Sequence, residues 1–443
     1  MAFKTFMAIA VCKILKIIGK MVGKGSSLPG KFALKIDRDI LNKIRLPENI
    51  IAVTGSNGKT STVEMIAHIL QCGGKKVVWN KEGSNQIEGV TTLILSNCSF
   101  SGQMKADILL IESDERYAKY TFKYFRPTHY VITNLYRDQL TRNGHPQWVY
   151  AALKDSIYDE TRLILNADDP LVSLFGDGRD NNVWFGLERF DGSTEECVGM
   201  YRDGTYCPKC YAKMNYEYYH YNHIGKYACP NCGHHRHDTD FTVTGVDLAQ
   251  GLVEIDHEIK IKLALNSLYN VYNFLAAYTV CSLMGMDKQV IGDSISSYIM
   301  KNGRVVQFEL GEHKGTLLTS KHENSVSYDH SIRYAAAYPE NCSVLLIVDA
   351  VSRKYFTSET SWLWDIYFNG LNSPNIQSVT LCGTYANDLA VRFAYTNIPQ
   401  EKIRVEPSIE KEIEYLKENG NEKLFVITCF SDKDKLLSSV KVL

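Results

Sequence analysis

A short glycine-bearing segment, residues 55–60, reads Gly-Ser-Asn-Gly-Lys-Thr between an apolar run and a helical pattern. Its two glycines let backbone amides turn toward an anion, and the N-terminus of the following helix favours negative charge. Lys59 brings positive charge to β- and γ-phosphates, and the Thr60 hydroxyl suits Mg²⁺. The strict phosphate-loop pattern needs glycine where Val53 stands, which leaves a glycine turn with an incidental lysine as the alternative. The order strand, loop, helix favours a phosphate loop.

Two Cys-x-x-Cys pairs form the second chemical signal: Cys207 with Cys210, and Cys229 with Cys232. Eighteen residues (211–228) separate them, which is the spacing of a zinc ribbon. Four thiolates complete a tetrahedron around Zn²⁺ and leave no open position, so the predicted role is structural. The alternative is a redox or iron–sulfur site. With four cysteines available, we expect the neighbouring histidines to lie on the surface: His220, His223, His234, His235 and His237.

The overall composition narrows the class of protein. The chain has 443 residues, 45% hydrophobic and 22% charged, which is typical of a globular protein with more than one domain. A net charge of −1 gives no basic field for nucleic acid, so no nucleic-acid partner is expected. Twelve cysteines in a chain of this length do not indicate a secreted disulfide scaffold. We therefore expect a reducing, cytoplasmic location.

The elements that must position these residues follow an α/β pattern. Short apolar runs alternate with helical patterns from residue 49 to about 175, which predicts a mostly parallel sheet whose ligands bind at the strand ends. A small insertion over about 200–240 interrupts the pattern. We expect three parts: an N-terminal helix and lead-in over 1–48, a central ATP-binding domain over 49–305, and a smaller α/β C-terminal domain over 306–443.

The first twenty residues predict an amphipathic helix. Lysines at positions 4, 13, 16 and 20 interrupt the apolar run, so no stretch reaches the ~20 apolar residues of a spanning helix. A cleavable signal peptide is not indicated either. Two alternatives stay open: packing on the protein's own core, or peripheral contact with the inner face of the cell membrane.

At "TGSNGKTST" the sequence resembles the ATP loop of the Mur ligase family, which forms amide bonds in peptidoglycan and folate-polyglutamate synthesis. The stretch "GKGSSLPGKFALKI" at 23–36 resembles the N-terminal signature of the MurT branch, the ligase subunits of lipid II isoglutaminyl synthases. The resemblance implies an α/β fold with a Mur-ligase-like central ATPase domain, a zinc-ribbon insertion and a smaller α/β C-terminal domain. It also implies ATP, Mg²⁺ and a structural Zn²⁺.

Several residues receive roles only through this resemblance. Glu112, at the end of "ADILLIE", is expected to hold Mg²⁺ together with Thr60, whereas Asp114 and Glu115 are read equally well as a solvated turn. Asn134 and Asp138 match the family's stretch near a second metal, although Gln139 replaces the usual histidine there. The implied nucleotide contacts are Gly55, Ser56, Asn57, Gly58, Lys59, Thr60, Ser61, Asn166, Asn270, Asn273 and Arg304.

The implied reaction is ATP-dependent amide formation. A carboxylate is phosphorylated to an acyl phosphate with help from Lys59 and Glu112, and ammonia then displaces the phosphate. In the MurT branch the carboxylate is the α-carboxyl of D-glutamate in lipid II, and ammonia comes from a partner resembling the glutamine amidotransferase GatD. Asp365 in "TSWLWD" matches an aspartate that the family lends to that partner. It is read equally well as an incidental carboxylate beside two core tryptophans.

Two departures keep other functions open. The stretch "LTSKHENSVSYD" retains Lys321 but lacks the Asn-Pro of the branch, and "DAVSRKYFTSET" lacks its Asp-Gly-Arg-Asp. The alternatives are a paralogous Mur-type ligase with another carboxylate acceptor, or a nucleotide-binding scaffold with reduced catalysis. Lys59 and Glu112 favour a working enzyme, because a scaffold has little need of either.

Overall fold

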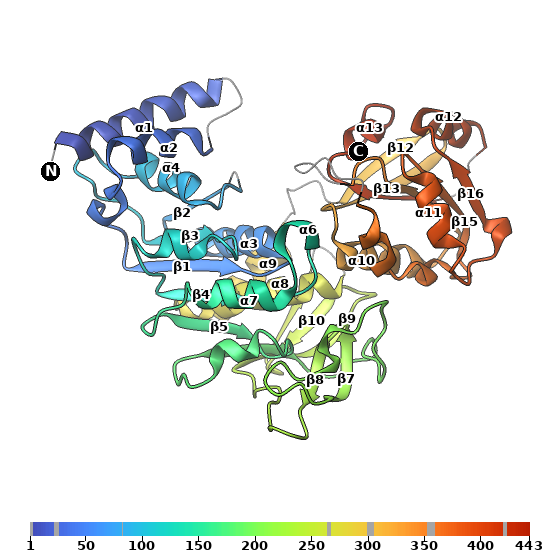
Figure 1. Cartoon of the computed structure of the whole chain (residues 1–443), viewed down its shortest axis with the longest axis horizontal. Helices are drawn as coiled ribbons and strands as arrows, with labels where there is room; N and C mark the ends of the chain where they lie inside the picture. The colour runs from blue at the N-terminus through green and yellow to red at the C-terminus, as the bar shows by residue number, and fades with distance from the viewer. Residues whose placement is uncertain are drawn as a thin grey trace. The chain divides into compact units, whose positions relative to one another are not determined.

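The structure is a computed structural model that describes residues 3–21, 26–81, 83–263, 267–298, 305–351, 359–419 and 423–443. The chain packs into two compact units, each built on its own sheet (Figure 1). Unit 1 consists of Met1–Tyr136, His145–Cys197 and Asp203–Ile299. Unit 2 consists of Arg137–Gly144, Val198–Arg202 and Met300–Leu443. Two α/β units confirm the predicted fold class, while the domain limits at 48 and 305 stay predictions.

Unit 1 contains a nine-stranded sheet in the order β11-β10-β9-β6-β5-β4-β1-β3-β2. The seven strands at positions β9-β6-β5-β4-β1-β3-β2 of this order pair in parallel, and β10 and β11 add an antiparallel edge. Their bounds are β1 Asn49–Thr54, β2 Val77–Trp79, β3 Ile108–Glu112, β4 His129–Ile132, β5 Arg162–Asn166, β6 Val183–Leu187, β9 Phe241–Asp247, β10 Leu252–Ile255 and β11 Ile259–Lys262. The central strands β1, β3, β4 and β5 are mostly buried and largely apolar, as expected of a sheet covered on both faces.

Helices cover both faces of this sheet. The residues of one face pack in two clusters: Ile50 and Leu109 pack with α4 (Ile87–Asn97), and Ala52, Tyr130 and Leu163 pack with α5 (Ala118–Phe122) and α7 (Pro146–Lys154). On the opposite face, α3 (Lys59–Cys72) packs against α8 (Leu268–Leu283) and α9 (Lys288–Ser296). This arrangement places the N-terminus of α3 directly after β1, where a parallel sheet binds its ligands.

The predicted N-terminal helix is α1 (Phe3–Met21), which is followed by α2 (Leu28–Ile36) and the 3-10 helix η1 (Ile40–Lys43). The buried side of α1, including Ala8, Ile9 and Cys12, packs with α2 and α4 in one hydrophobic cluster. The structure therefore confirms that one face of this helix packs on the protein's own core. None of the helices in the described ranges has the length and apolar character needed to cross a membrane.

Unit 2 contains a seven-stranded sheet in the order β16-β15-β14-β17-β13-β12-β18. The strands from β13 to β16 pair in parallel, and β12 and β18 form an antiparallel edge. The strands are β12 Val305–Leu310, β13 His313–Ser320, β14 Cys342–Ile347, β15 Ile376–Cys382, β16 Ile403–Glu406, β17 Lys423–Cys429 and β18 Lys441–Val442. The helices are α6 Leu140–Asn143, α10 Ser325–Ala336, α11 Ala386–Phe393, α12 Ile409–Asn419 and α13 Lys433–Leu437.

Candidate active site

The predicted phosphate loop connects β1 to α3, with Gly55 and Gly58 both at positive φ (138° and 82°). These conformations favour glycine, and the surroundings demand it as well. A Cβ on Gly58 would lie 1.9 Å from Asn273 Oδ1, and one on Gly55 would lie 2.1 Å from Thr133 Oγ1. The two glycines therefore let side chains from α8 and from the end of β4 approach the loop backbone.

Asn134 holds the loop from the side of β4. Its Oδ1 accepts a hydrogen bond from the Asn57 amide at 2.9 Å, and its Nδ2 donates to the Asn57 carbonyl at 3.1 Å. The Asn134 carbonyl accepts from the Ser56 amide at 2.9 Å. The Ser56 hydroxyl in turn accepts from the Tyr136 amide at 2.9 Å. Asn134, which the resemblance assigned to a second metal, is thus built into the loop itself, a role that spacing along the sequence does not reveal.

Lys59 begins α3 and is buried beside Glu115. Its Nζ pairs with Glu115 Oε1 and donates to the Gly55 carbonyl. Burial raises the pKa of Glu115, although the charge of Lys59 opposes that shift. Reading Asp114 and Glu115 as a solvated turn is therefore wrong, because both carboxylates are buried. The sequence signal for Glu115 is its place three residues beyond the end of β3, which pairs with the strand that leads into the loop.

Glu112 ends β3 and lies opposite Val53 of β1 in the sheet register. Its backbone is fixed by Asn80, whose Oδ1 accepts from the Glu112 amide at 2.8 Å. Asn85 Nδ2 lies 3.4 Å from Glu112 Oε1. Lys59 pairs with Glu115 rather than with Glu112. The buried carboxylate of Glu112 therefore stands at the end of β3, next to the strand that leads into the loop. Carboxylate oxygens are ligands that Mg²⁺ prefers.

The remaining predicted nucleotide contacts divide into two groups. Asn273 reaches the loop, with its Oδ1 3.4 Å from Thr62 Oγ1, whereas Asn270 is buried one turn earlier on α8. Asn166, fully buried at the end of β5, donates to the Thr133 carbonyl at 2.9 Å and supports the loop from behind. Arg304 lies outside the described residues. The nucleotide role of each of these residues stays a prediction.

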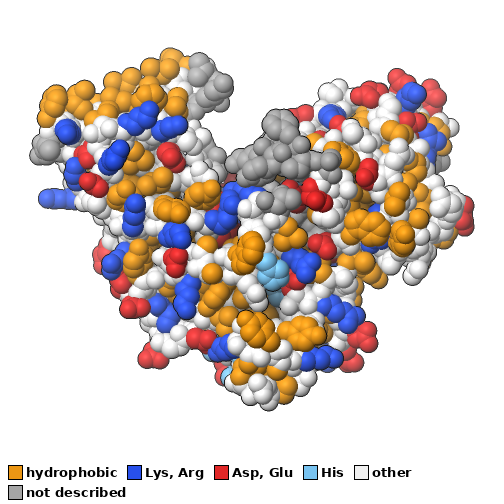
Figure 2. Space-filling view, viewed as in Figure 1, with side chains coloured by type: hydrophobic (Ala, Val, Ile, Leu, Met, Phe, Trp, Pro, Cys, Tyr) orange, Lys and Arg blue, Asp and Glu red, His pale blue; other side chains and the backbone are white. Residues whose placement is uncertain are grey.

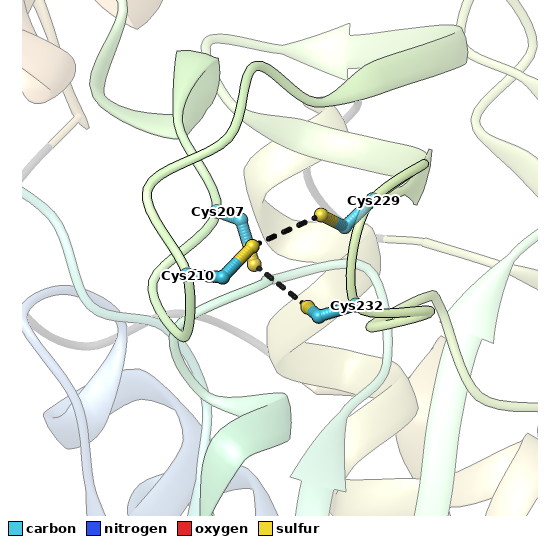
Figure 3. Close-up of side chains that lie close together, drawn as sticks. All are labelled: Cys207, Cys210, Cys229 and Cys232. Carbon is cyan, nitrogen blue, oxygen red and sulfur yellow. Dashed lines mark hydrogen bonds between the residues drawn. The ribbon is translucent and has the colours of Figure 1, made fainter.

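The four cysteines of the predicted ribbon converge, as Figure 3 shows. Their sulfur atoms all lie within 4.8 Å of one another, with 3.5 Å between Cys207 and Cys232 and between Cys210 and Cys229. A tetrahedron of Zn–S bonds of ~2.3 Å separates sulfur atoms by ~3.8 Å. The donor set and its dimensions therefore fit a structural Zn²⁺.

The two halves of the ribbon are similar knuckles, one before β7 (Asn215–Tyr221) and one after β8 (Ile224–Ala228), and both lie at the open end of this hairpin, where Asn215 pairs with Ala228. The Tyr211 amide donates to the Cys207 carbonyl at 2.9 Å, and the Gly233 amide donates to the Cys229 carbonyl at 3.1 Å. Tyr211 and Gly233 each follow the second cysteine of a pair and each has positive φ. This repeated turn directs both thiols of a pair toward one point.

The histidine prediction is wrong for three of the five residues. His220, His223 and His234 are buried, while His235 is exposed and His237 half-buried. His223 Nε2 lies 3.7 Å from Asp169 Oδ2, and His234 Nε2 lies 3.0 Å from the Pro170 carbonyl. These rings dock the ribbon onto the segment after β5, a non-local packing role that composition alone does not reveal.

Asp365 belongs to unit 2, at the end of the 3-10 helix η4 (Ser361–Asp365). Its Oδ1 lies 3.6 Å from Arg137 Nη1, and 23% of its side chain is exposed. Of the two neighbouring tryptophans, Trp362 is buried but Trp364 is 44% exposed, so only one belongs to the core. The carboxylate of Asp365 is therefore accessible at the predicted position. In the same unit, Asp138 Oδ1 accepts a hydrogen bond from Asn324 Nδ2 at 2.8 Å.

Comparison with known families identifies this architecture. Residues 53–281, more than half of the chain, match the family model for the Mur ligase middle domain. The chain belongs to the Mur ligase family. Residues 322–432 of this Mur ligase match a second family model, described as MurT ligase C-terminal. Both matches bear out the resemblance recognised in the sequence, and they confirm the prediction of a ligase.

Curated relatives extend the similarity over nearly the whole Mur ligase chain. It is 29% identical over 411 residues to the lipid II isoglutaminyl synthase (glutamine-hydrolyzing) subunit MurT of Staphylococcus aureus (strain COL), covering 92% of this chain and 91% of that protein. It is also 29% identical over 438 residues to the MurT subunit of Streptococcus pneumoniae (strain ATCC BAA-255 / R6), covering 97% of this chain and 96% of that protein.

Solved structures support the same fold at lower identity. A pseudomurein peptide ligase type C from Methanothermus fervidus aligns with a TM-score of 0.68 at 20% identity, covering 91% of this chain and 80% of that one. MurF from Acinetobacter baumannii aligns with a TM-score of 0.64 at 14% identity, covering 92% of this chain and 80% of that one. Membership of the Mur ligase family implies ATP and Mg²⁺, in agreement with the loop and with Glu112.

Proposed function

We propose that this chain is the ligase subunit of a two-protein enzyme that amidates the α-carboxyl of D-glutamate in lipid II. The observation that carries the proposal is the pairing of an intact phosphate loop with a strand-end carboxylate, Glu112, in a chain similar along its whole length to MurT subunits. We also propose that it works in the cytoplasm, at the inner face of the membrane, because lipid II is a membrane-bound substrate.

Lys59 and the loop amides would bind the triphosphate of ATP, and Thr60 and Glu112 would hold Mg²⁺, which neutralises charge on the transferring phosphoryl group. The substrate carboxylate attacks the γ-phosphorus, so that a bond forms to the acyl oxygen and ADP leaves. Lys59 must exchange its contact with Glu115 for the phosphate oxygens during this cycle, and Glu115 keeps the lysine buried and oriented until then.

Ammonia then attacks the acyl carbon of the acyl phosphate. Inorganic phosphate leaves, the amide forms, and one proton is released from the attacking nitrogen. At neutral pH free ammonia is mostly protonated, so a glutaminase partner resembling GatD would deliver it unprotonated. The names of the curated relatives, which specify a glutamine-hydrolysing subunit of a synthase, support such a partner.

Asp365 would orient a histidine of that partner. Its carboxylate lies 3.6 Å from Arg137 and its side chain is 23% exposed, which lets a residue of the partner approach it. We expect Asp365→Asn to lower glutamine hydrolysis by about 10-fold or more in the reconstituted complex, because a neutral amide orients an imidazolium poorly. Ammonium chloride supplied directly should restore amidation. Full glutaminase activity in the variant would contradict the role of Asp365.

The decisive experiment is reconstitution with a GatD-like glutaminase, followed by mass spectrometry of lipid II incubated with ATP and glutamine. Amide formation that requires both co-substrates supports the proposal. Lys59→Ala should remove amidation with glutamine and with ammonium alike. ATP turnover on another carboxylate would indicate the paralogous ligase, and nucleotide binding without turnover would indicate the scaffold.

A further inference from the structure

The outer side of α1 carries a continuous apolar stripe that no other part of the described structure covers. Its members recur at helical spacing on the side opposite the buried residues Thr5, Ala8, Ile9 and Cys12, so they form a second apolar face. Figure 2 shows this face as a band along α1. The exposed members are Phe3, Phe6, Met7, Ile14, Ile17, Ile18 and Met21.

The apolar surface continues beyond α1. Leu28 and Phe32 of α2 are both exposed, and Phe100 lies with its ring 5.5 Å from that of Phe6. Scattered exposed apolar residues are normal on a protein surface, but a contiguous group from two helices and a loop marks an interaction surface. We call this group, together with the α1 stripe, the outer apolar face.

Lysines flank the outer apolar face. The sequence before Asp37 contains no aspartate or glutamate, while Lys4, Lys13, Lys20 and Lys31 are among the lysines that it carries. Lys13 lies over the Phe100 ring with Nζ 5.7 Å from its centroid, at the border between the basic and apolar parts. An apolar stripe bordered by lysines without any acid is the pattern of a helix that lies in the headgroup region of a bilayer.

A cavity of about 270 Å³ opens at one flank of α1. Lys16, Lys20 and Lys81 contribute to its lining, together with polar residues such as Ser84 and Asn97. Three lysines around a cavity that also holds polar side chains favour an anionic group such as a phosphate. The cavity therefore adds a contact for headgroup phosphates at the border of the apolar face.

From this geometry we propose that the outer apolar face docks on an anionic lipid bilayer, with its aromatic and aliphatic side chains at the level of the acyl boundary and its lysines on headgroup phosphates. A second copy of the chain fits less well, because a symmetric contact through this face would bring the lysines of both copies together. The inference adds the bilayer as a partner to the proposed function, and vesicle binding without lipid II tests it separately, so either can fail while the other stands.

The test is co-sedimentation of the full-length chain, alone and with its glutaminase partner, with vesicles of pure phosphatidylcholine or of phosphatidylcholine with phosphatidylglycerol at 3:1. We expect binding to the anionic vesicles that weakens as salt rises. Ile14→Glu with Ile17→Glu should reduce binding at least ~10-fold, because both side chains are more than half exposed and enter the acyl boundary. Lys16→Gln with Lys20→Gln should reduce binding about fivefold per lysine on anionic vesicles only.

Trp148→Glu is the matched control, since Trp148 is 73% exposed on α7 of the same unit and lies outside the outer apolar face. It should bind vesicles like the unchanged chain, and all variants should keep the same melting temperature. Equal binding to neutral vesicles, or unchanged binding by the isoleucine variant, would overturn the proposal. A dimer in analytical ultracentrifugation that the isoleucine variant abolishes, or loss of vesicle binding when the partner is present, would assign the face to protein contacts instead.

Discussion

The phosphate loop and the cysteine ribbon both lie in unit 1, yet they are held together in opposite ways. The four ribbon ligands fall within residues 207–232, and each knuckle closes on its own backbone hydrogen bonds. The loop at 55–58 instead depends on Asn134 and Asn273, which are far away in the sequence. A candidate metal site can thus be local, whereas the predicted phosphate loop takes its shape only after the sheet and α8 have assembled.

The two regions are nevertheless connected. Tyr221 of β7 and Tyr136 share a buried hydroxyl–hydroxyl hydrogen bond, and the Tyr136 backbone contacts Ser56 of the loop. Asp169, which faces His223 of the ribbon, accepts from the Leu135 amide at 2.8 Å. The segment 134–136 therefore contacts the ribbon on one side and the loop on the other.

We expect the largest effect from a substitution that removes the positive charge of Lys59 and leaves the ribbon unchanged. Lys59→Ala should lower ATP turnover about 100- to 1000-fold, because a preorganised cation at the phosphates is lost. Steady-state ATPase measurements check this. Since the variant leaves buried Glu115 without its lysine, Lys59→Ala with Glu115→Gln should restore the melting temperature but not turnover. Lys119→Ala, an exposed lysine paired with Asp155, is the control and should behave like the unchanged chain.

We expect the next largest effect from substitutions that disrupt the cysteine ribbon and leave the residues of the loop unchanged. Cys229→Ser with Cys232→Ser should take the zinc content from one ion per chain to none and lower the free energy of unfolding on the order of several kcal/mol. The KM for ATP should rise through the contact of Tyr221 with Tyr136, while turnover at saturation persists. Elemental analysis measures the zinc content, and urea unfolding measures the free energy of unfolding. Cys72→Ser, an exposed cysteine on α3, is the control, and iron in place of zinc would contradict the ribbon.

The same contrast explains how far the sequence could predict this structure. Cysteine spacing and the Gly-Lys-Thr motif are local patterns, so the ribbon and the loop were recognisable before folding, as was the α/β alternation of both units. The burial of His220 and His223 was not, because it depends on where the hairpin docks after β5. For the same reason the sequence leaves a solvated turn as an equal alternative for Glu115, although this side chain is buried and pairs with a lysine 56 residues away.

A smaller effect sharpens the idea that the loop is held from a distance. Asn134→Ala removes two hydrogen bonds to the Asn57 backbone. The Asn57 carbonyl keeps the Thr133 hydroxyl at 3.1 Å, so the loss falls mainly on the amide and costs about 1–3 kcal/mol. The KM for ATP should therefore rise roughly 10-fold or more. Asn134→Asp keeps the acceptor for the Asn57 amide but loses the donor to its carbonyl, so its effect should be intermediate. Zinc content should stay at one ion in both variants, and an unchanged KM for ATP would show that the loop holds its shape without Asn134.

The smallest effect concerns the ribbon's own docking and depends on pH. Burial disfavours the charged form of His223, but the hydrogen bond and charge of Asp169 outweigh it and raise the pKa of the ring above its usual 6.5. A raised folded-state pKa contributes stability that is complete below the unfolded pKa of ~6.5 and is lost as pH rises through the folded value. Urea unfolding of the chain and of His223→Gln, from the mildly acid range where zinc stays bound up to alkaline pH, should show a difference that shrinks as pH rises. His235→Gln, at an exposed position, should show no such trend. A difference that instead grows with pH would mean that the ribbon docks through a neutral ring, and that Asp169 serves only the backbone amides of Leu135, Leu171 and Val172.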